Sequence, residues 1–227
     1  MKTTMFGTMI LMLCLAASLP PAQAATLSAS QDAYVDDLHP TWQEGGLDPT
    51  NLYVLKPDGR DTRTLVQFDV SSIILPPGGS VSSAILKLQV NPGLNVIGYG
   101  QTVSAYRVTQ QWVDWGVTWN DALYTVPWTW TTPGGDYDPA VHGDYVSPGG
   151  SIVYLTTLSL DITPIVQGWV DGTNPNYGVI LKGTSGVSLA FYSMEAGSAP
   201  TLDITMVPEP FSLALLAFGG LLLFRRR

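Results

Sequence analysis

The sequence predicts an all-β fold, an antiparallel β-sandwich of jelly-roll type with one short helix. Many short runs of β-branched and aromatic residues alternate with turn residues, and the 227-residue chain contains 23 glycines and 17 prolines. Glycine and proline are unfavourable inside helices, so long helices are excluded. Only 12% of the side chains are charged, which excludes a coiled coil and an acidic disordered protein because both need far more charge.

Ten runs have the composition and length expected of strands. They are Ala33–Val35, Leu52–Leu55, Thr64–Val70, Ser82–Val90, Thr102–Val108, Ser151–Leu155, Leu158–Ile162, Gly178–Lys182, Ser188–Tyr192 and Thr201–Met206. The fourth run has apolar residues at every second position from Ala84 to Val90, which places one face of that strand toward a core. Short strands at this spacing, separated by clusters such as Pro76-Pro77-Gly78-Gly79, are typical of a sandwich or jelly roll.

The helix is predicted over Thr163–Val170. Pro164 suits the first helical position, with Thr163 as the expected cap, and Gly172 follows the end as a residue that tolerates a left-handed conformation. One face is apolar through Ile165, Val166, Trp169 and Val170. We expect this face to cover one open end of the sandwich.

The N-terminus has the pattern of a secretory signal peptide over residues 1–24. Lys2 precedes the apolar run Met9–Ala17, and small residues stand at the −3 and −1 positions of a cleavage site between Ala24 and Ala25. The alternative, an N-terminal membrane anchor, is disfavoured because the run is too short. Signal peptidase is therefore an expected partner. Since the single cysteine, Cys14, lies inside this segment, the exported protein has no disulfide.

The C-terminus, residues 207–227, resembles the PEP-CTERM sorting signal. Pro208, Glu209 and Pro210 precede the fourteen-residue, mostly apolar run Phe211–Phe224, and three arginines end the chain. Taken alone, the run could be a core helix, and it is shorter than the ~20 residues of an ordinary spanning helix. The resemblance implies a short transmembrane helix that enters the inner membrane transiently and an exosortase-type enzyme that cuts near the Pro-Glu-Pro motif. It also implies release to, or retention at, the surface of a Gram-negative bacterium with abundant exopolysaccharide.

The segment between these signals, residues 25–206, resembles the disaggregatase-related (DNRLRE) domain, a carbohydrate-binding-module-like family of secreted β-sandwiches. Seven phrases match in the family's order: residues 32–35, 63–73, 81–88, 112–120, 162–169, 176–182, and 191–195 followed by 200–202. Met194 stands where the family has an arginine before the glutamate at Glu195, and the resemblance lapses over Tyr124–Pro148. The resemblance to a carbohydrate-binding-module-like family implies that the protein associates with carbohydrate.

The charge distribution excludes nucleic acid as a partner and raises the possibility of calcium. Residues 25–206 contain six basic and 17 acidic residues, and 15 of the acids are aspartate; phosphate binding needs clustered lysine and arginine. Aspartates at strand ends can ligate a structural calcium ion or form turns and a soluble surface. The candidates for calcium are Asp32, Asp36, Asp37, Asp69 and Asp203.

Aromatic residues supply the candidate ligand-binding site, because sugar rings stack on flat aromatic faces. Trp128 and Trp130 would share one face of a strand, and Tyr124 and Tyr137 lie in the same Pro/Gly-rich insertion. Trp115 is a further candidate. The alternative is that the insertion aromatics pack locally and anchor a long loop. The other tryptophans of the family-like phrases are expected in the core, namely Trp112, Trp119 and Trp169.

Catalysis has weaker support in the sequence. The chain has two histidines, His39 and His142, no cysteine after the signal peptide and no Gly-x-Ser-x-Gly motif. Glu195 and Asp114 are the nominated carboxylate pair if the protein hydrolyses glycosides. The leading prediction is a secreted, non-catalytic carbohydrate-binding protein of the cell surface or extracellular matrix, whose partner is a polysaccharide. The alternatives are a polysaccharide hydrolase or lyase, and a purely structural surface protein.

Overall fold

The computed structural model describes residues 22–43, 48–126, 128–140, 143–148 and 155–208. The described residues from Ala22 to Pro208 form one compact unit. Of the predicted signal peptide (residues 1–24) and the predicted sorting signal (residues 207–227), only residues 22–24 and 207–208 belong to the described part of the chain, so neither prediction is tested. Within the described part of the chain, no helix has the length and apolar character needed to span a membrane.

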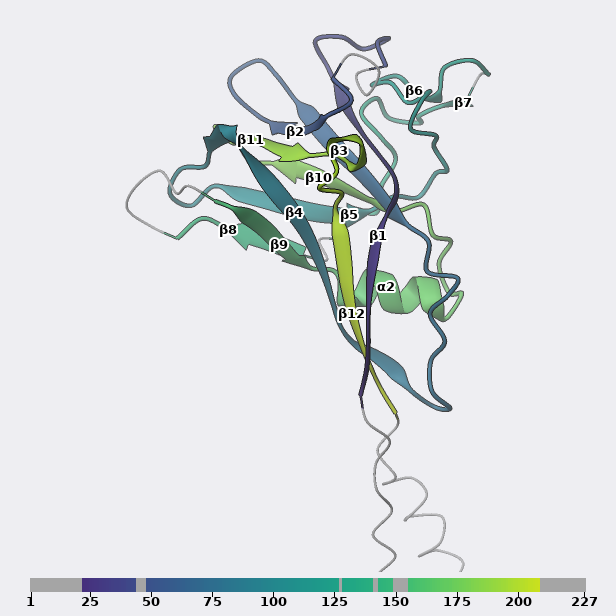
Figure 1. The fold of residues 1–227 in the computed structure, drawn as a ribbon. Helices are drawn as coiled ribbons and strands as arrows, with labels where there is room; N and C mark the ends of the chain where they lie inside the picture. The colour runs from purple at the N-terminus through teal and green to yellow at the C-terminus, as the bar shows by residue number, and fades with distance from the viewer. Residues whose placement is uncertain (1–21, 44–47, 127, 141–142, 149–154, 209–227) are drawn as a thin grey trace, which may run out of the picture. The chain divides into compact units, whose positions relative to one another are not determined.

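The described residues of this unit form twelve strands and one α-helix, whose arrangement Figure 1 shows. In chain order they are β1 (Gln23–Asp36), β2 (Asn51–Leu55), β3 (Thr62–Phe68), β4 (Ser80–Val96), β5 (Thr102–Arg107), β6 (Asp121–Leu123), β7 (Trp128–Thr129), β8 (Gly143–Val146), β9 (Thr157–Asp161), α2 (Thr163–Val170), β10 (Val179–Gly183), β11 (Ser188–Tyr192), the 3₁₀ turn η1 (Met194–Ala196) and β12 (Thr201–Val207). All the pairings are antiparallel. The prediction of an all-β antiparallel sandwich with one short helix is confirmed.

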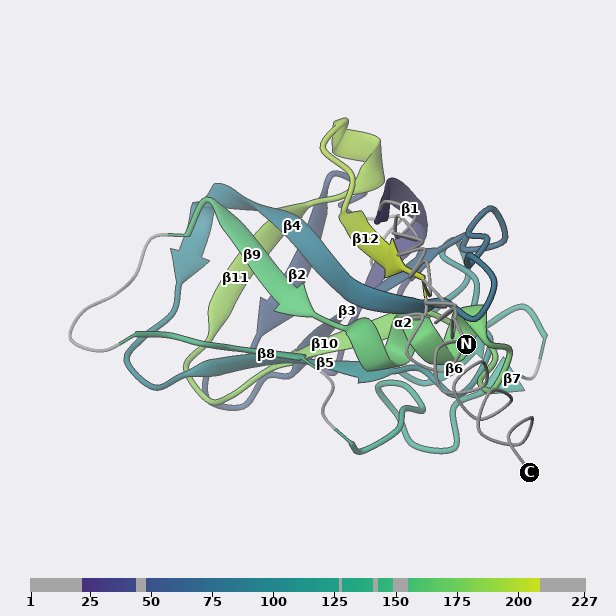
Figure 2. The ribbon, with the colours of Figure 1, turned by 90° about the horizontal axis from the view of Figure 1, so that it is seen from below.

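Two long strands connect the two layers, which Figure 2 shows from below. The first half of β1 pairs with β12 and its second half pairs with β3. In the same way, β4 pairs first with β12 and then with β11. One layer therefore has the order β1-β12-β4-β9, and the other has the order β8-β5-β10-β3, continued by β2 and β11. At one end of the layers lies α2, whose Ile165, Val166 and Trp169 enter the core between them.

A second, smaller core covers the outer face of β1, β3 and β10. Leu65 and Ile180 point into this core, whereas their neighbours Val66 and Val179 point into the main core. The outer face is covered by the chain from β5 to Tyr137, which contributes Trp112 and other buried residues, namely Val108, Val117, Ala122 and Trp130. The loop that carries residues 112–117 is therefore held on the sheet by its own apolar contacts.

The predicted elements differ from the observed ones in three ways. Strand β1 begins at Gln23, ten residues before its prediction, because it pairs along β12 before it reaches β3. Strands β7 and β8 lie in the segment Tyr124–Pro148, which was predicted as an insertion or long loop, and β6 lies directly before it where no strand was predicted. The strand predicted over Ser151–Leu155 lies outside the described residues except for Leu155, which is not in a strand.

The helix has its predicted bounds, but its first residue has another role. Ile162 is the N-cap residue and no side chain caps the helix. The Thr163 hydroxyl donates to Asp161 Oδ1 at 2.6 Å and accepts from the Ala84 amide at 2.8 Å. Thr163 therefore ties the helix to β4 rather than capping it. Gly172 adopts the left-handed conformation expected after the helix, with φ of 71°.

Candidate functional site

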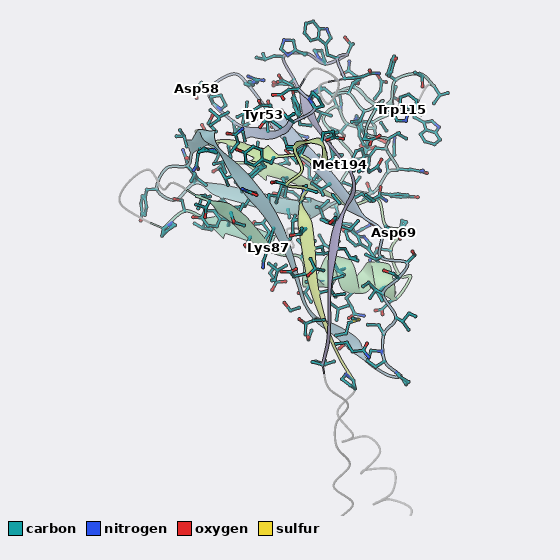
Figure 3. The ribbon with its side chains drawn as sticks, in the orientation of Figure 1. Tyr53, Asp58, Asp69, Lys87, Trp115 and Met194 are labelled. Atoms are coloured by element: carbon teal, nitrogen blue, oxygen red, sulfur yellow. The ribbon has the colours of Figure 1, made fainter. Side chains whose placement is uncertain are left out.

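Four segments that are distant in the sequence enclose a cavity of about 330 Å³. They are the middle of β1, the residues before β2, the turn after Trp112 and the η1 turn. Figure 3 shows Tyr53, Trp115 and Met194 around this end of the sandwich, whereas Lys87 and Asp69 lie away from it. The lining residues are Asp32, Ala33, Gln43, Asp48, Pro49, Asn51, Leu52, Asp114, Trp115, Ser193 and Glu195.

Asp32 is the buried carboxyl group of this cavity. Its residue is 6% exposed, and its Oδ2 accepts a hydrogen bond from the Met194 amide at 2.9 Å. Its Oδ1 is buried and finds no hydrogen-bond donor among the described residues. Burial, together with the charges of Glu195 and Asp114, raises the pKa of Asp32 to about 7 although the Met194 amide opposes this shift. Perturbed carboxyl groups in cavities are typical of functional sites.

Asp48 forms the opposite wall and is ordered by its neighbours. Tyr53 donates to its Oδ2 at 2.6 Å, and Thr50 and Asn51 donate to the same carboxylate. Burial opposes ionisation of Asp48, but these hydrogen bonds outweigh burial and lower its pKa. Burial of the phenol, together with the hydrogen bond to Asp48, raises the pKa of Tyr53 to about 12. This wall therefore carries a fixed negative charge.

The η1 turn places Ser193 and Glu195 on the third side. The Ser193 amide donates to Thr50 O at 3.2 Å, and its hydroxyl donates to Pro49 O. The hydrogen bond from Met194 to Asp32 joins the same turn to β1. Glu195 is thus carried by a turn that is bonded to two of the other walls.

Asp114 and Trp115 complete the cavity from the loop that covers the second core. The Asp114 amide donates to Gln31 Oε1 at 3.3 Å, and Gln31 Nε2 donates to Trp112 O at 3.3 Å. The Trp115 amide donates to Asp114 Oδ1 at 2.6 Å. Trp115 itself is 60% exposed, so β1 and the buried Trp112 hold a loop that presents an accessible indole ring.

The cavity combines carboxylates with an exposed aromatic ring. Among the described residues that line it, four are acidic and none is lysine, arginine or histidine. Carboxylates accept hydrogen bonds from hydroxyl groups, while a flat indole stacks on the apolar face of a sugar. Trp42, 52% exposed and stacked on His39 at 4.5 Å, precedes the lining residue Gln43. The arrangement can therefore bind a polyhydroxylated ring.

The structure does not gather the predicted aromatic residues into one platform. Trp130 is 4% exposed, and its indole donates to Thr118 O at 3.0 Å, so its ring belongs to the second core. Trp128 is 46% exposed and lines another cavity with Gln110. Tyr137 lines a third cavity, Tyr124 is exposed and lines none of these three, and only Trp115 lines the acidic one.

Local packing anchors the insertion that carries these residues. Arg63 Nη1 donates to Gly134 O at 2.8 Å, and its guanidinium lies 4.6 Å from the centre of a Trp119 ring. A Cβ at Gly134 would lie 2.6 Å from Arg63, and Gly134 has φ of 89°, so this close approach requires glycine. Among the insertion aromatics, Trp130 and Tyr137 follow the alternative, because both pack in or against the second core, whereas Trp128 and Tyr124 are exposed. Trp112 and Trp169 are buried as predicted, and Trp119 packs against the second core.

The five aspartates predicted for calcium do not lie together. Asp36 pairs with Arg60, Asp37 accepts from the Asp61 amide, Asp69 accepts from the Ser71 amide, and Asp203 pairs with Lys87. No group of three or more His, Cys, Asp or Glu side chains in the described ranges is arranged to hold a metal ion. These residues do not fit a shared calcium site, and calcium binding stays a prediction from composition.

The structure brings together residues that the sequence suggested for different reasons. Asp32, Trp115, and the Asp114–Glu195 pair line the same cavity. No pattern in the sequence singled out Asp48, Asn51 or Ser193, which reach the cavity because β2 pairs with β11. Of the two histidines, His39 stacks on Trp42 and does not line the cavity, and His142 lies outside the described residues.

Comparison with known proteins identifies one family for this architecture. The family model described as carbohydrate-binding module family 96 matches residues 23–206, which is nearly the whole compact unit. No curated protein matches the chain.

Proposed function

The chain belongs to carbohydrate-binding module family 96, and we propose that it binds a polysaccharide without cleaving it, through the cavity lined by Asp32, Asp114, Glu195 and Trp115. The observation that carries this proposal is that the exposed Trp115 ring lines the same cavity as the carboxylates of Asp32, Asp114 and Glu195. The segments that carry Asp114 and Glu195 are held to β1 by hydrogen bonds. An aromatic ring next to hydrogen-bonding groups can bind a sugar in two ways: the aromatic ring stacks on the apolar C–H face, and the polar groups bond with the hydroxyl groups at the edge. Binding at one small site is weak, and many copies on a surface would strengthen it by avidity.

Trp115→Ala is expected to weaken polysaccharide binding by about ten- to a hundredfold, because it removes the stacking surface of the cavity. The measurement is retention of the full-length protein in affinity gels that contain single polysaccharides, chosen from a glycan-array screen. The stability should change little, since the ring is 60% exposed.

Trp128→Ala is the matched control, because Trp128 is a similarly exposed tryptophan that lines a different cavity. It should leave retention unchanged. Loss of retention in Trp128→Ala with normal retention in Trp115→Ala would move the site to the insertion. Absence of retention by every polysaccharide would favour the purely structural alternative.

One observation favours a second candidate, a polysaccharide hydrolase or lyase. Glycoside hydrolysis uses one carboxyl group that keeps its proton near neutral pH and a second that is ionised. Asp32, with a pKa of about 7, lies in the same cavity as Asp114 and Glu195. New reducing ends or unsaturated products from a retained polysaccharide, abolished by Asp32→Asn, would establish this activity in place of simple binding.

Export and C-terminal sorting are the second part of the proposal. Ala25, the expected first residue of the mature protein, pairs with Ile204 of the neighbouring strand β12, so the two ends of the mature unit lie side by side. Asp32 lies seven residues further along β1, which corresponds to roughly 23 Å of extended strand. A protein held at its C-terminus would therefore present the cavity away from its point of attachment. The DNRLRE-like phrases and the PEP-CTERM-like tail support a location at the surface or in the matrix of a Gram-negative bacterium.

Replacement of Pro208, Glu209 and Pro210 by alanine is expected to block C-terminal processing while N-terminal cleavage continues. An exosortase-type enzyme would no longer recognise its motif, so the protein should keep its apolar tail and remain with the membrane fraction. The check is intact mass of the protein recovered from cells. As the internal control, the measured mass should still correspond to a chain that starts at Ala25. Normal loss of the tail would refute the prediction of a sorting signal.

A further inference from the structure

We propose that the acidic cavity selects a polysaccharide built from positively charged amino sugars, with the ammonium group directed at Asp32 and its neighbouring carboxylates and the sugar ring placed on Trp115. The inference rests on the proposed binding function and names the chemical class of its ligand. Three independent features of the cavity support it: its charge, the state of its buried carboxyl group and the spacing of its acceptors.

The charge of the cavity disfavours anionic polysaccharides. Its lining includes Asp32, Asp48, Asp114 and Glu195, and no basic side chain lines it among the residues that the structure describes. The nearby cations are already paired, since Arg60 bonds with Asp36 and both Lys56 and Arg63 bond with Asp61. A uronate or sulfated sugar would meet like charge with no counter-ion, and like-charge contacts at an interface are strongly unfavourable.

One oxygen atom of the buried Asp32 carboxyl group lacks a hydrogen-bond donor, which a cationic ligand would supply. Asp32 is 6% exposed and lines the cavity, yet its Oδ1 has no hydrogen-bond donor within the described part of the chain. Such an acceptor is costly to leave unpaired, and an ionised donor makes the stronger hydrogen bond. An ammonium group brings three donors and a positive charge to the place where Asp114 and Glu195 also bear on Asp32.

The spacing of the acceptors favours an organic cation over a metal ion. The carboxylates belong to separate walls of a cavity of about 330 Å³, and no three of the described acidic or histidine side chains converge as metal ligands do. Calcium needs six to eight oxygen atoms at 2.3–2.6 Å from one point. A sugar ring that carries an ammonium group can instead fill the space between the walls. Trp115 adds a ring face that attracts both the sugar and its cationic group.

The test compares a fully deacetylated glucosamine hexamer, its N-acetylated counterpart and a galacturonate hexamer, by calorimetric titration of the full-length protein at about pH 6, where sugar amines are largely protonated. The first two ligands differ only in the charge and bulk of the nitrogen substituent. We expect the deacetylated oligomer to bind at least about tenfold more tightly than the acetylated one, and the galacturonate to show no binding. Added salt should reduce this preference, because it depends on charge.

Two variants separate charge selection from general sugar binding. Glu195→Gln keeps the shape of the side chain and removes its charge, so the ratio of the two affinities should fall about three- to tenfold. Asp69→Asn removes the same charge from a carboxylate outside the cavity and should leave the ratio unchanged. Equal or tighter binding of the acetylated or galacturonate oligomer, failure of the deacetylated oligomer to bind, or an unchanged ratio in Glu195→Gln would overturn the inference. If a neutral glycan then still bound through Trp115, the proposed binding function would stand without it.

Discussion

Trp112→Ala is expected to lower the free energy of unfolding by about 3–5 kcal/mol, the usual cost of truncating a buried tryptophan. Trp112 is 1% exposed in the second core, and its indole donates to Tyr177 O at 2.8 Å. Its own carbonyl accepts from Gln31, the side chain that also holds the Asp114 amide. The substitution should therefore loosen the loop that carries Trp115 and weaken sugar binding as well. Urea denaturation measures the first effect, and affinity gels measure the second.

A matched pair of substitutions separates the hydrogen bond of Trp112 from its bulk. Trp169 is also buried, at 6% exposed, but its indole N–H has no acceptor within the described ranges. Phenylalanine at position 112 leaves Tyr177 O without its donor, whereas phenylalanine at position 169 removes an unsatisfied donor. Trp112→Phe should cost about 1–2 kcal/mol more than Trp169→Phe. Equal costs would show that the indole hydrogen bond contributes nothing to holding the loop.

Strand composition and alternation were sufficient to predict the architecture. The alternation of apolar residues in β4 correctly predicted which of its faces is buried, namely that of Ala84, Leu86, Leu88 and Val90. The early half of β1 was missed because Thr26 and Ser28 give it little apolar character, and its place is determined by pairing with β12. Long-range pairing of this kind adds strand length that local composition does not record.

The candidate site could be predicted only in pieces. Asp32 was selected as a strand-end aspartate, Trp115 as an aromatic residue, and Asp114 with Glu195 as a carboxylate pair. They meet because β1 lies beside the η1 turn and Gln31 holds the loop after Trp112. Residues up to 163 positions apart thus form one cavity, and no sequence spacing encodes that closeness.

Trp128 and Trp130 do not form the expected shared face, because the strand that contains Trp128 ends before Trp130. Two residues that are two apart share a face only within a continuous strand. Strand β7 contains Trp128 and Thr129 alone, and the chain leaves it before Trp130. The Trp130 indole then turns inward to Thr118 O. A buried tryptophan is more stable when its N–H finds an acceptor, and the inward orientation of Trp130 provides one.

Asp32→Asn is expected to stabilise the protein at pH 8, by up to about 4 kcal/mol, and to have almost no effect at pH 4. The folded protein raises the pKa of Asp32 to about 7 from an ordinary value of 3.8, chiefly through burial. Between these values the unfolded chain releases the proton while the folded protein keeps it, so stability falls as the pH rises through this range. Asparagine removes that loss and can still accept from the Met194 amide. Urea titrations of both proteins from about pH 4 to 8 test this, and parallel pH profiles would contradict it.

Asp36→Asn provides a control of opposite sign on the same strand. Burial opposes ionisation of Asp36, but the hydrogen bonds from Arg60 and the Leu38 amide outweigh it and lower the pKa. A lowered pKa contributes stability above the ordinary carboxyl range, and this contribution is lost as the pH falls. Asp36→Asn should therefore destabilise the protein by about 1–3 kcal/mol at neutral pH, with a smaller effect in acid. If both substitutions shifted stability in the same direction at neutral pH, the two carboxyl groups would not differ as their surroundings require. Asp32 would then not be a carboxyl group that the folded protein keeps protonated in the absence of its proposed cationic ligand.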